Sequence, residues 1–398
     1  MRAMVPMRRA GGQVGTVAAM ATLTRVGTVA AIATVTRVGT VAAIATVATL
    51  AMVTRVATVA GQSSPVVWQS QLSGVTVRLR GASAVSGDVA WASGAQGTVL
   101  RTLDGGRTWQ ARPVAGASAL DFRDVDAVTA QTAYALSIGP GDASRIYKTR
   151  DGGTTWTLQL TVTDPKMFLD AMAFRDEAHG VAFGDSVDGR FVVFTTANGG
   201  ADWRQVPADR LPPALPGEGA FAASGTNVAM EPGGRIWIGT TASRVLRSAD
   251  DGRTWTVVQT PLATGQATGI FSIAFPDATH GVVVGGNYQQ EKAALDTVAT
   301  TSDGGLTWTR GPGSGLAPGL SGFRSVVAWW PGNGRIGVDG RSGGWLAVGP
   351  SGSDWSVDDG RTWTPAGGDG YDALSLVPAD STGWATGAGG RLARVTAR

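Results

Sequence analysis

Short runs of apolar or alternating residues, each bounded by glycine, recur along residues 64–398 and predict β-strands. In one unit of the pattern the runs are Leu169–Phe174, Gly180–Gly184, Arg190–Thr196 and Trp203–Val206. Runs of four to eight residues between turn residues are typical of strands. Four strands per repeat is the unit of a propeller blade, so the pattern predicts an all-β propeller made of four-stranded sheets.

One octet recurs six times, between the third and the fourth run. The copies are TLDGGRTW (102–109), TRDGGTTW (149–156), TANGGADW (196–203), SADDGRTW (248–255), TSDGGLTW (301–308) and SVDDGRTW (356–363). The third residue, Asp or Asn, can accept hydrogen bonds from backbone N–H groups two residues on, and the fifth, Gly, allows the positive φ of a tight hairpin. We expect a looser turn in the third copy, which has Asn198 and Asp202.

The two ends of the repeat region indicate how the ring closes. After Trp363 the chain has three strand-like runs, Ala373–Val377, Gly383–Gly387 and Arg391–Thr396, and no further octet. Near the other end, the run around Trp68 resembles a fourth strand without its octet. We therefore expect seven blades, with residues 66–72 completing the C-terminal sheet and removing a free sheet edge. A six-bladed ring is the alternative.

Composition excludes several kinds of chemistry. The 398 residues contain no Cys and only two His, His179 and His280. Disulfides, thiolate catalysis and Cys-ligated metals are therefore excluded, and we expect no metal and no cofactor. The two histidines occupy equivalent points of the repeat, which favours a role in a turn. Residues 1–62 hold six arginines and no acid, so the rest of the chain is mildly acidic, and we predict no nucleic-acid partner.

The first 62 residues differ from the repeat region and are predicted to be an export signal of low complexity. They combine a basic start, an apolar run over residues 38–53 and small residues before Gly61, the pattern of a secretory signal. This predicts a periplasmic or secreted protein whose propeller occupies residues 63–398. Arginines interrupt every window of about 20 residues, so we expect no transmembrane anchor. The alternative is a tandem duplication or a start codon assigned too far upstream.

The octets match the Asp box, or BNR repeat, of β-propellers. With the closing strand and the spacing, residues 64–398 resemble the photosystem II stability/assembly factor-like proteins. The resemblance implies structural acids on peripheral hairpins and a non-enzymatic binding or assembly scaffold. It implies a protein or peptide partner, with an anionic small ligand or a glycan as further possibilities. Many relatives occur in bacteria without photosynthesis, so the resemblance does not imply a photosystem partner.

The candidate site lies where the first strand of each blade begins, around the central channel. Aligning those strands by their apolar anchors gives one position per blade: Arg80, Arg123, Asp170, Glu218, Phe271, Arg324 and Asp372. The six charged positions predict a polar rim that binds an anionic or peptide ligand, because arginine makes bidentate contacts with carboxylates. The alternative is a ring of salt bridges in which these residues pair with one another.

Three arginines near a channel also raise a glycoside hydrolase as the alternative function, since sialidases have Asp boxes and bind a carboxylate with three arginines. Such enzymes need a nucleophilic Tyr with carboxyl partners. Tyr371, beside Asp372, is the nearest candidate, and core packing is the simpler interpretation. For other glycosidases the first pair of carboxyls to compare is Asp170 and Glu218. The insert Asn287–Asp296 in the fifth blade is a candidate partner-contact loop.

Overall fold

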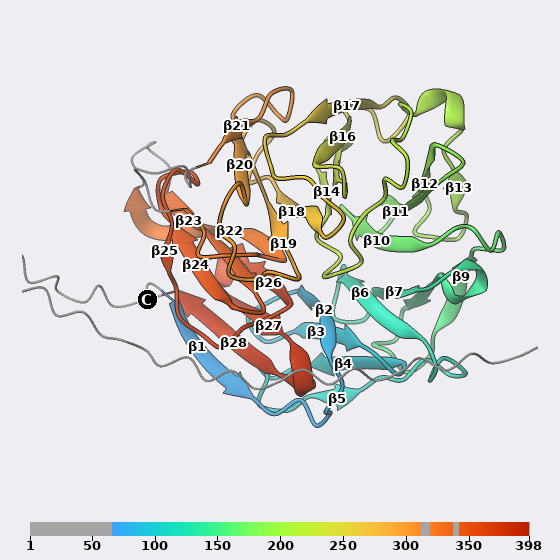
Figure 1. The fold of residues 1–398 in the computed structure, drawn as a ribbon. Coiled ribbons are helices and arrows are strands. Elements are labelled where there is room, and N and C mark those ends of the chain that lie inside the picture. The colour runs from blue at the N-terminus through green and yellow to red at the C-terminus, as the bar shows by residue number, and fades with distance from the viewer. Residues whose placement is uncertain (1–65, 312–318, 337–341, 398) are drawn as a thin grey trace, which may run out of the picture. The chain divides into compact units, whose positions relative to one another are not determined.

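The computed structural model describes residues 66–311, 319–336 and 342–397, so the predicted export signal lies outside the described residues. Within them, seven four-stranded antiparallel sheets form a ring (Figure 1). The predicted seven-bladed β-propeller is therefore confirmed. The first strands of neighbouring blades contact one another around the whole ring and line its centre.

The blades follow one another along the chain, numbered here in that order. Blades one to three consist of β2 (Leu79–Ala84), β3 (Ala90–Gly94), β4 (Thr98–Thr102) and β5 (Gln110–Ala111); β6 (Asp121–Ala127), β7 (Ala133–Ile138), β8 (Arg145–Thr149) and β9 (Thr157–Thr161); β10 (Leu169–Phe174), β11 (Gly180–Val187), β12 (Arg190–Thr196) and β13 (Arg204–Gln205). Blades four and five consist of β14 (Val228–Glu231), β15 (Arg235–Gly239), β16 (Arg244–Ser248) and β17 (Thr256–Gln259); β18 (Thr268–Ala274), β19 (Gly281–Asn287), β20 (Val298–Thr301) and β21 (Thr309–Arg310). Blades six and seven consist of β22 (Val326–Ile336), β23 (Ser342–Gly349), β24 (Gly352–Ser356) and β25 (Thr364–Pro365); β26 (Ala373–Val377), β27 (Thr382–Thr386), β28 (Leu392–Ala397) and β1 (Val66–Gln71). The described helices are single 3₁₀ turns, at Gly141–Ala143, Ala208–Arg210, Pro378–Asp380 and Ala388–Gly390.

The closing strand β1 lies where the sequence predicts it. It pairs antiparallel with β28, from Val66 opposite Ala397 to Gln71 opposite Leu392. Trp68 stacks on Tyr371 with ring centroids 5.0 Å apart, and its Nε1 donates to the carbonyl of Ala366 at 3.0 Å. Both ends of the propeller thus share one sheet, and the predicted ring closure is confirmed.

The octets form the turns between the third and the fourth strand of a blade. In the first copy, Asp104 accepts hydrogen bonds from the backbone N–H of Thr108 (2.9 Å) and from its hydroxyl (2.7 Å). The carboxylate therefore contacts a residue four positions on, instead of the two that we expected. In the third copy Asn198 accepts from the N–H of Asp202 and donates to its carboxylate at 2.8 Å. The Asn/Asp exchange reverses the polarity of the contact and leaves the turn closed, so the expected loosening is wrong.

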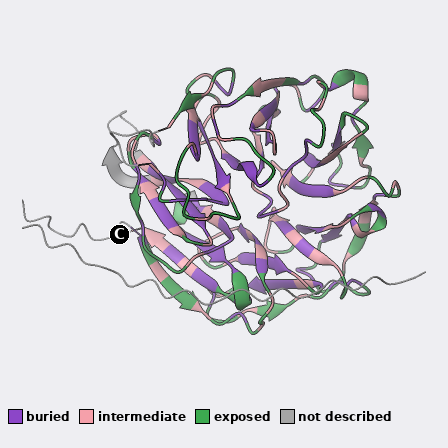
Figure 2. Ribbon diagram, viewed as in Figure 1, coloured by how far each residue is buried: buried purple, intermediate pink, exposed green. Residues whose placement is uncertain are grey.

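Apolar side chains of consecutive blades pack together and form the core between them. Between blades three and four, for example, residues of β11 and β12 pack against residues of β15 and β16. Burial is greatest on the middle strands of the blades, such as β3 and β7, whereas the short outer strands β5 and β13 are exposed (Figure 2). The blades are held mainly by this apolar packing, which leaves the loops at the two faces free for other roles.

Candidate functional site

β-bulges explain how the inner strands present side chains at the channel. The register of four inner strands shifts at one residue each: Arg80 in β2, Arg123 in β6, Asp170 in β10 and Phe271 in β18. A bulge leaves one residue unpaired and re-aims its side chain. These are four of the seven positions that the sequence alignment of the blades selected.

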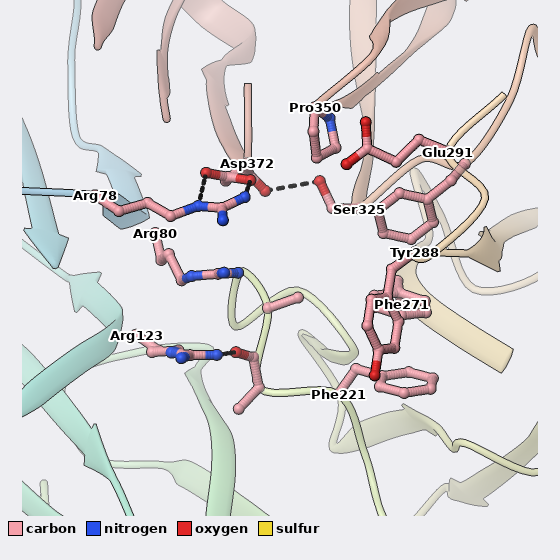
Figure 3. Close-up of a pocket in the computed structure, with 13 residues that line it drawn as sticks. Arg78, Arg80, Arg123, Phe221, Phe271, Tyr288, Glu291, Ser325, Pro350 and Asp372 are labelled. Carbon is pink, nitrogen blue, oxygen red and sulfur yellow. Dashed lines mark hydrogen bonds and ion pairs between the residues drawn. The ribbon is translucent and has the colours of Figure 1, made fainter. Parts of the chain in front are cut away.

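A pocket of about 340 Å³ lies at one mouth of the channel. Arg78, Arg80 and Arg123 lie along one wall, and aromatic side chains, among them Phe271 and Tyr288, lie opposite (Figure 3). The pocket combines cationic donors with apolar area, as ligand pockets generally do.

The three arginines differ in their partners. Arg78 makes two hydrogen bonds with the buried Asp372, from Nε at 2.7 Å and from Nη2 at 2.6 Å. Arg123 donates to Asp121 and to the carbonyl of Ala222, both at 2.9 Å. The guanidinium of Arg80 has no hydrogen bond or ion pair with the described residues.

The surroundings of Arg80 disfavour the charged form of its side chain. Burial, together with the nearby charges of Arg123 and Arg78, lowers its pKa to about 10. An anion bound beside Arg80 would offset the cost of burial and the repulsion, because an opposite charge nearby stabilises the charged form. The pocket thus holds one uncompensated arginine between two arginines that are fixed in place.

The segment 219–227, which precedes β14, contributes Phe221, Ala222 and Ala223 to the lining of the pocket. Within it, Ala222 accepts the hydrogen bond of Arg123 in blade two, and Phe221 stacks on Phe271 of blade five at 3.8 Å. Ser224 donates to the carbonyl of Ser325, beside blade six, at 3.1 Å. The segment therefore spans the channel and makes the pocket a cup.

The structure brings three of the six charged positions together. Arg80, Arg123 and Asp372 line the pocket, whereas the other three do not. Arg324 is fully buried, and its Nε donates to Asp354 at 2.8 Å. Asp170 is buried with its pKa raised well above the usual value by burial and by Asp185.

Glu218, the third position outside the pocket, makes hydrogen bonds with Thr240 and with Arg244, whose Nε lies 2.9 Å away. The first strand of blade four begins only at Val228, and a long segment precedes it. Glu218 therefore lies ten residues before the strand, and it is not equivalent to the positions with which the sequence alignment grouped it. Glu218 lines a second pocket of the described part of the chain, and Asp170 is not among the residues that line it.

Nine of the lining residues were not among the predicted ones, and four of these nine shape the chemistry of the pocket: Arg78, Phe221, Tyr288 and Glu291. Tyr288 and Glu291 belong to the insert Asn287–Asp296, whose extra length was a signal. Arg78 lies just before β2, outside any predicted strand. The alternation of side chains along a strand therefore could not indicate in which direction its side chain points.

The histidines belong to turns between first and second strands. Asp176 accepts hydrogen bonds from the backbone N–H of His179 and from its ring, and Asp277 does the same for His280. Within the described ranges, no group of His, Cys, Asp or Glu residues could hold a metal ion. No helix in the same part of the chain is long and apolar enough to cross a bilayer.

Seven blades around a channel, with a cup of arginines and aromatics at one mouth, define a β-propeller with a binding pocket. The sequence matches no family model and no curated protein. Solved structures of the same fold include "YCF48 bound to D1 peptide", with a TM-score of 0.54 and 15% identity over 83% of this chain and 95% of that one. YCF48 from Cyanidioschyzon merolae has a TM-score of 0.58 and 16% identity over 83% of this chain and 98% of its own.

A GH74 xyloglucanase from Xanthomonas campestris is also similar, with a TM-score of 0.53 and 16% identity. The match covers 83% of this chain and 53% of the enzyme. The resemblance to YCF48, a photosystem II assembly factor, is thus confirmed at the level of the fold. Because the same fold occurs in an assembly factor and in an enzyme, the function depends on the pocket.

Proposed function

We propose that this protein is a non-enzymatic binding scaffold that acts outside the cytoplasm and takes a carboxylate-bearing segment of a protein or peptide into the pocket. The observation that carries the proposal is the unpaired guanidinium of Arg80, which faces the aromatic wall across the pocket. The cellular location rests on the basic and apolar pattern of residues 1–62.

The donors of Arg80 suit a carboxylate. A guanidinium binds a carboxylate through two parallel hydrogen bonds, and Arg80 has its donors free. Asp372 and Asp121 hold the neighbouring arginines, so little side-chain entropy is lost on binding. A solved propeller of the same fold is described as bound to a peptide, which supports a peptide partner here. An anionic small ligand or a glycan is the other outcome of the test.

Titration calorimetry with an acetylated pentapeptide that ends in a free carboxylate tests the proposal. We expect Arg80→Ala to weaken binding by about tenfold or more, the effect of losing a charged hydrogen bond, and added salt to weaken wild-type binding. Arg107→Ala, an exposed arginine of the first octet, is the matched control and should bind as wild type does. Equal affinity of Arg80→Ala and wild type would contradict the proposal, and binding of acidic sugars alone would redirect it to glycans.

The fold shared with a GH74 enzyme keeps glycoside hydrolysis as the second candidate. That reaction uses a pair of carboxyl groups. The carboxyls among the described lining residues are Asp372 and Glu291, and Asp372 is engaged by Arg78. A single free carboxylate fits binding better than hydrolysis, and we expect no release of reducing sugar from xyloglucan.

A further inference from the structure

Glu291 places a free carboxylate on the wall of the pocket opposite the arginines (Figure 3). Its backbone is fixed, because its carbonyl accepts hydrogen bonds from the N–H of Phe323 at 2.8 Å and from the hydroxyl of Ser351 at 3.1 Å. The side chain is half-buried and makes no hydrogen bond or ion pair with the described residues. A partly desolvated carboxylate without a partner favours a cationic group beside it.

Glu291 does not serve to neutralise the arginines by contact. The pKa of Arg78 is raised mainly by its hydrogen bond with Asp372, and Glu291 contributes only through its charge at a distance. Asp372 and Asp121 form ion pairs with Arg78 and Arg123, and they act on Arg80 only through their charge at a distance. The two free charges of the pocket, Arg80 and Glu291, therefore have opposite signs and lie on opposite walls.

The aromatic side chains lie on the same side as Glu291. Tyr288 is 45% exposed, and its ring makes angles of 71° and 65° with the rings of Phe221 and Phe271, with centroids 6.0 and 6.1 Å away. Ring faces attract ammonium and guanidinium groups, most strongly where water is partly excluded. A carboxylate beside exposed aromatic surface is suited to a cation with an apolar stem, such as a lysine side chain.

We propose that the pocket has two subsites, an anion subsite at Arg80 and a cation subsite at Glu291 and Tyr288. Its ligand is then a peptide segment with a lysine or arginine a few residues from a carboxylate. This inference rests on the proposed binding function and adds the second charge to the ligand.

Three acetylated pentapeptides test it by titration calorimetry. The first has lysine two residues before a free C-terminal carboxylate, the second has norleucine in place of the lysine, and the third keeps the lysine but ends in an amide. We expect the lysine acid to bind wild type about fivefold or more tightly than the norleucine acid, the scale of a cation–aromatic contact with a carboxylate nearby. Moving the lysine to one or three residues from the end locates the best spacing.

The variants separate the two subsites. Glu291→Gln should weaken binding of the lysine acid at least fivefold and leave the norleucine acid unchanged or slightly tighter, because a negative charge has left the pocket. Lys292→Gln, on the same insert but outside the pocket lining, is the matched control. Arg80→Ala should weaken both acids, and the lysine amide should depend on Glu291 but not on Arg80.

Each result bears on one proposal. Equal affinity for the lysine and norleucine acids, with dependence on Arg80 intact, would overturn the cation subsite and leave the proposed function standing. If neither acid depends on Arg80 but the lysine amide binds through Glu291, the proposed function fails and the cation subsite stands. If no peptide responds to Glu291→Gln, the cation subsite is wrong.

Discussion

Equivalent charged residues in neighbouring blades have different environments, and this separates binding from structural roles. Arg80 and Arg324 both lie at the start of an inner strand. Arg80 is partly exposed and unpaired, whereas Arg324 is fully buried and bonded to Asp354 and to the carbonyl of Phe323 at 2.7 Å. Removing one partner of a buried pair leaves the other charge uncompensated.

We therefore expect Arg324→Ala to lower the free energy of unfolding by about 3–5 kcal/mol. Arg80→Ala should change it by about 0.5 kcal/mol or less, as for a surface substitution. Thermal and urea unfolding of both variants measure the difference. Similar losses for the two variants would show that burial does not separate their roles.

Asp124, which is buried, and Asp126, which is half-buried, are acids on β6 that bind the next blade. Asp124 accepts the N–H of Met172 at 2.7 Å, and Asp126 accepts that of Phe174 at 2.6 Å. Burial raises the pKa of Asp124 to about 8 and that of Asp126 to about 6. Because both folded-state values lie above the value near 4 of an unfolded chain, the folded protein binds more protons between pH 4 and pH 8. Its stability should fall as the pH rises through this range.

Asp124→Asn should remove part of this dependence, since the amide oxygen still accepts from Met172 and carries no charge. We expect the variant to be more stable than wild type at pH 8 by about 1–3 kcal/mol and to differ little at pH 4. Urea unfolding at a series of pH values gives the profile. Asp142→Asn, whose parent side chain is 80% exposed, is the control; an unchanged profile for Asp124→Asn would contradict the assignment.

At the scale of elements, the octets join neighbouring blades as well as closing turns. A cation on the third strand of one blade reaches a turn of the next. Lys148 and Arg247 donate to octet carbonyls, those of Gly199 and Gly304. Arg101 and Arg394 lie beside an octet but donate to a turn between first and second strands, at the carbonyls of Ala130 and Gly87. The fourth octet residue beside these cations is Gly in each case, and a Cβ on Gly152 would lie 1.7 Å from Nη1 of Arg101.

Two junctions use a different arrangement. Thr195 and Thr300 occupy the position of the cation, and the octets that follow have Asp251 and Asp359 in place of Gly, both with a φ of 60°. The tryptophan of the sixth octet, Trp363, is 1% exposed, and its Nε1 donates to the carbonyl of Gly360 in the same octet. The fourth residue of an octet therefore depends on the third strand of the preceding blade: it is Gly where that strand carries a cation and Asp where it carries Thr.

Gly152→Ala tests this coupling. The methyl group clashes with Arg101 and meets a φ of +72°, so we expect a loss of about 1–3 kcal/mol in unfolding free energy. In the Arg101→Ala background the clash is absent and only the backbone cost should remain. A double-mutant cycle from urea unfolding measures the coupling energy, and additive losses would contradict the contact.

At the scale of the whole molecule, stability depends on closing the ring with β1. Besides its pairing with β28, this strand carries Gln71, which donates to the carbonyl of Gly105 at 2.9 Å and accepts from Trp109 and Trp384 at 3.1 and 3.2 Å. The last residue of β1 thus joins blade seven to the octet of blade one.

A chain without residues 1–72 should unfold at a markedly lower temperature than a chain without residues 1–62. It should also associate, because β28 becomes a free edge that can pair with another copy. Thermal unfolding and light scattering measure the two effects, and a synthetic peptide of residues 64–72 should reverse both. Equal melting temperatures for the two truncated chains would contradict ring closure by β1.

The strands, the octet turns, the blade number and the closing strand could all be predicted from the sequence, because each rests on local periodicity or on turn chemistry repeated along the chain. The same alignment found Arg80, Arg123 and Asp372. It could not show that Arg324 meets Asp354 in the core, or that the segment 219–227 crosses the channel. Those outcomes depend on contacts between blades, where burial and the nearest opposite charge decide whether a charged residue binds a ligand or holds the fold.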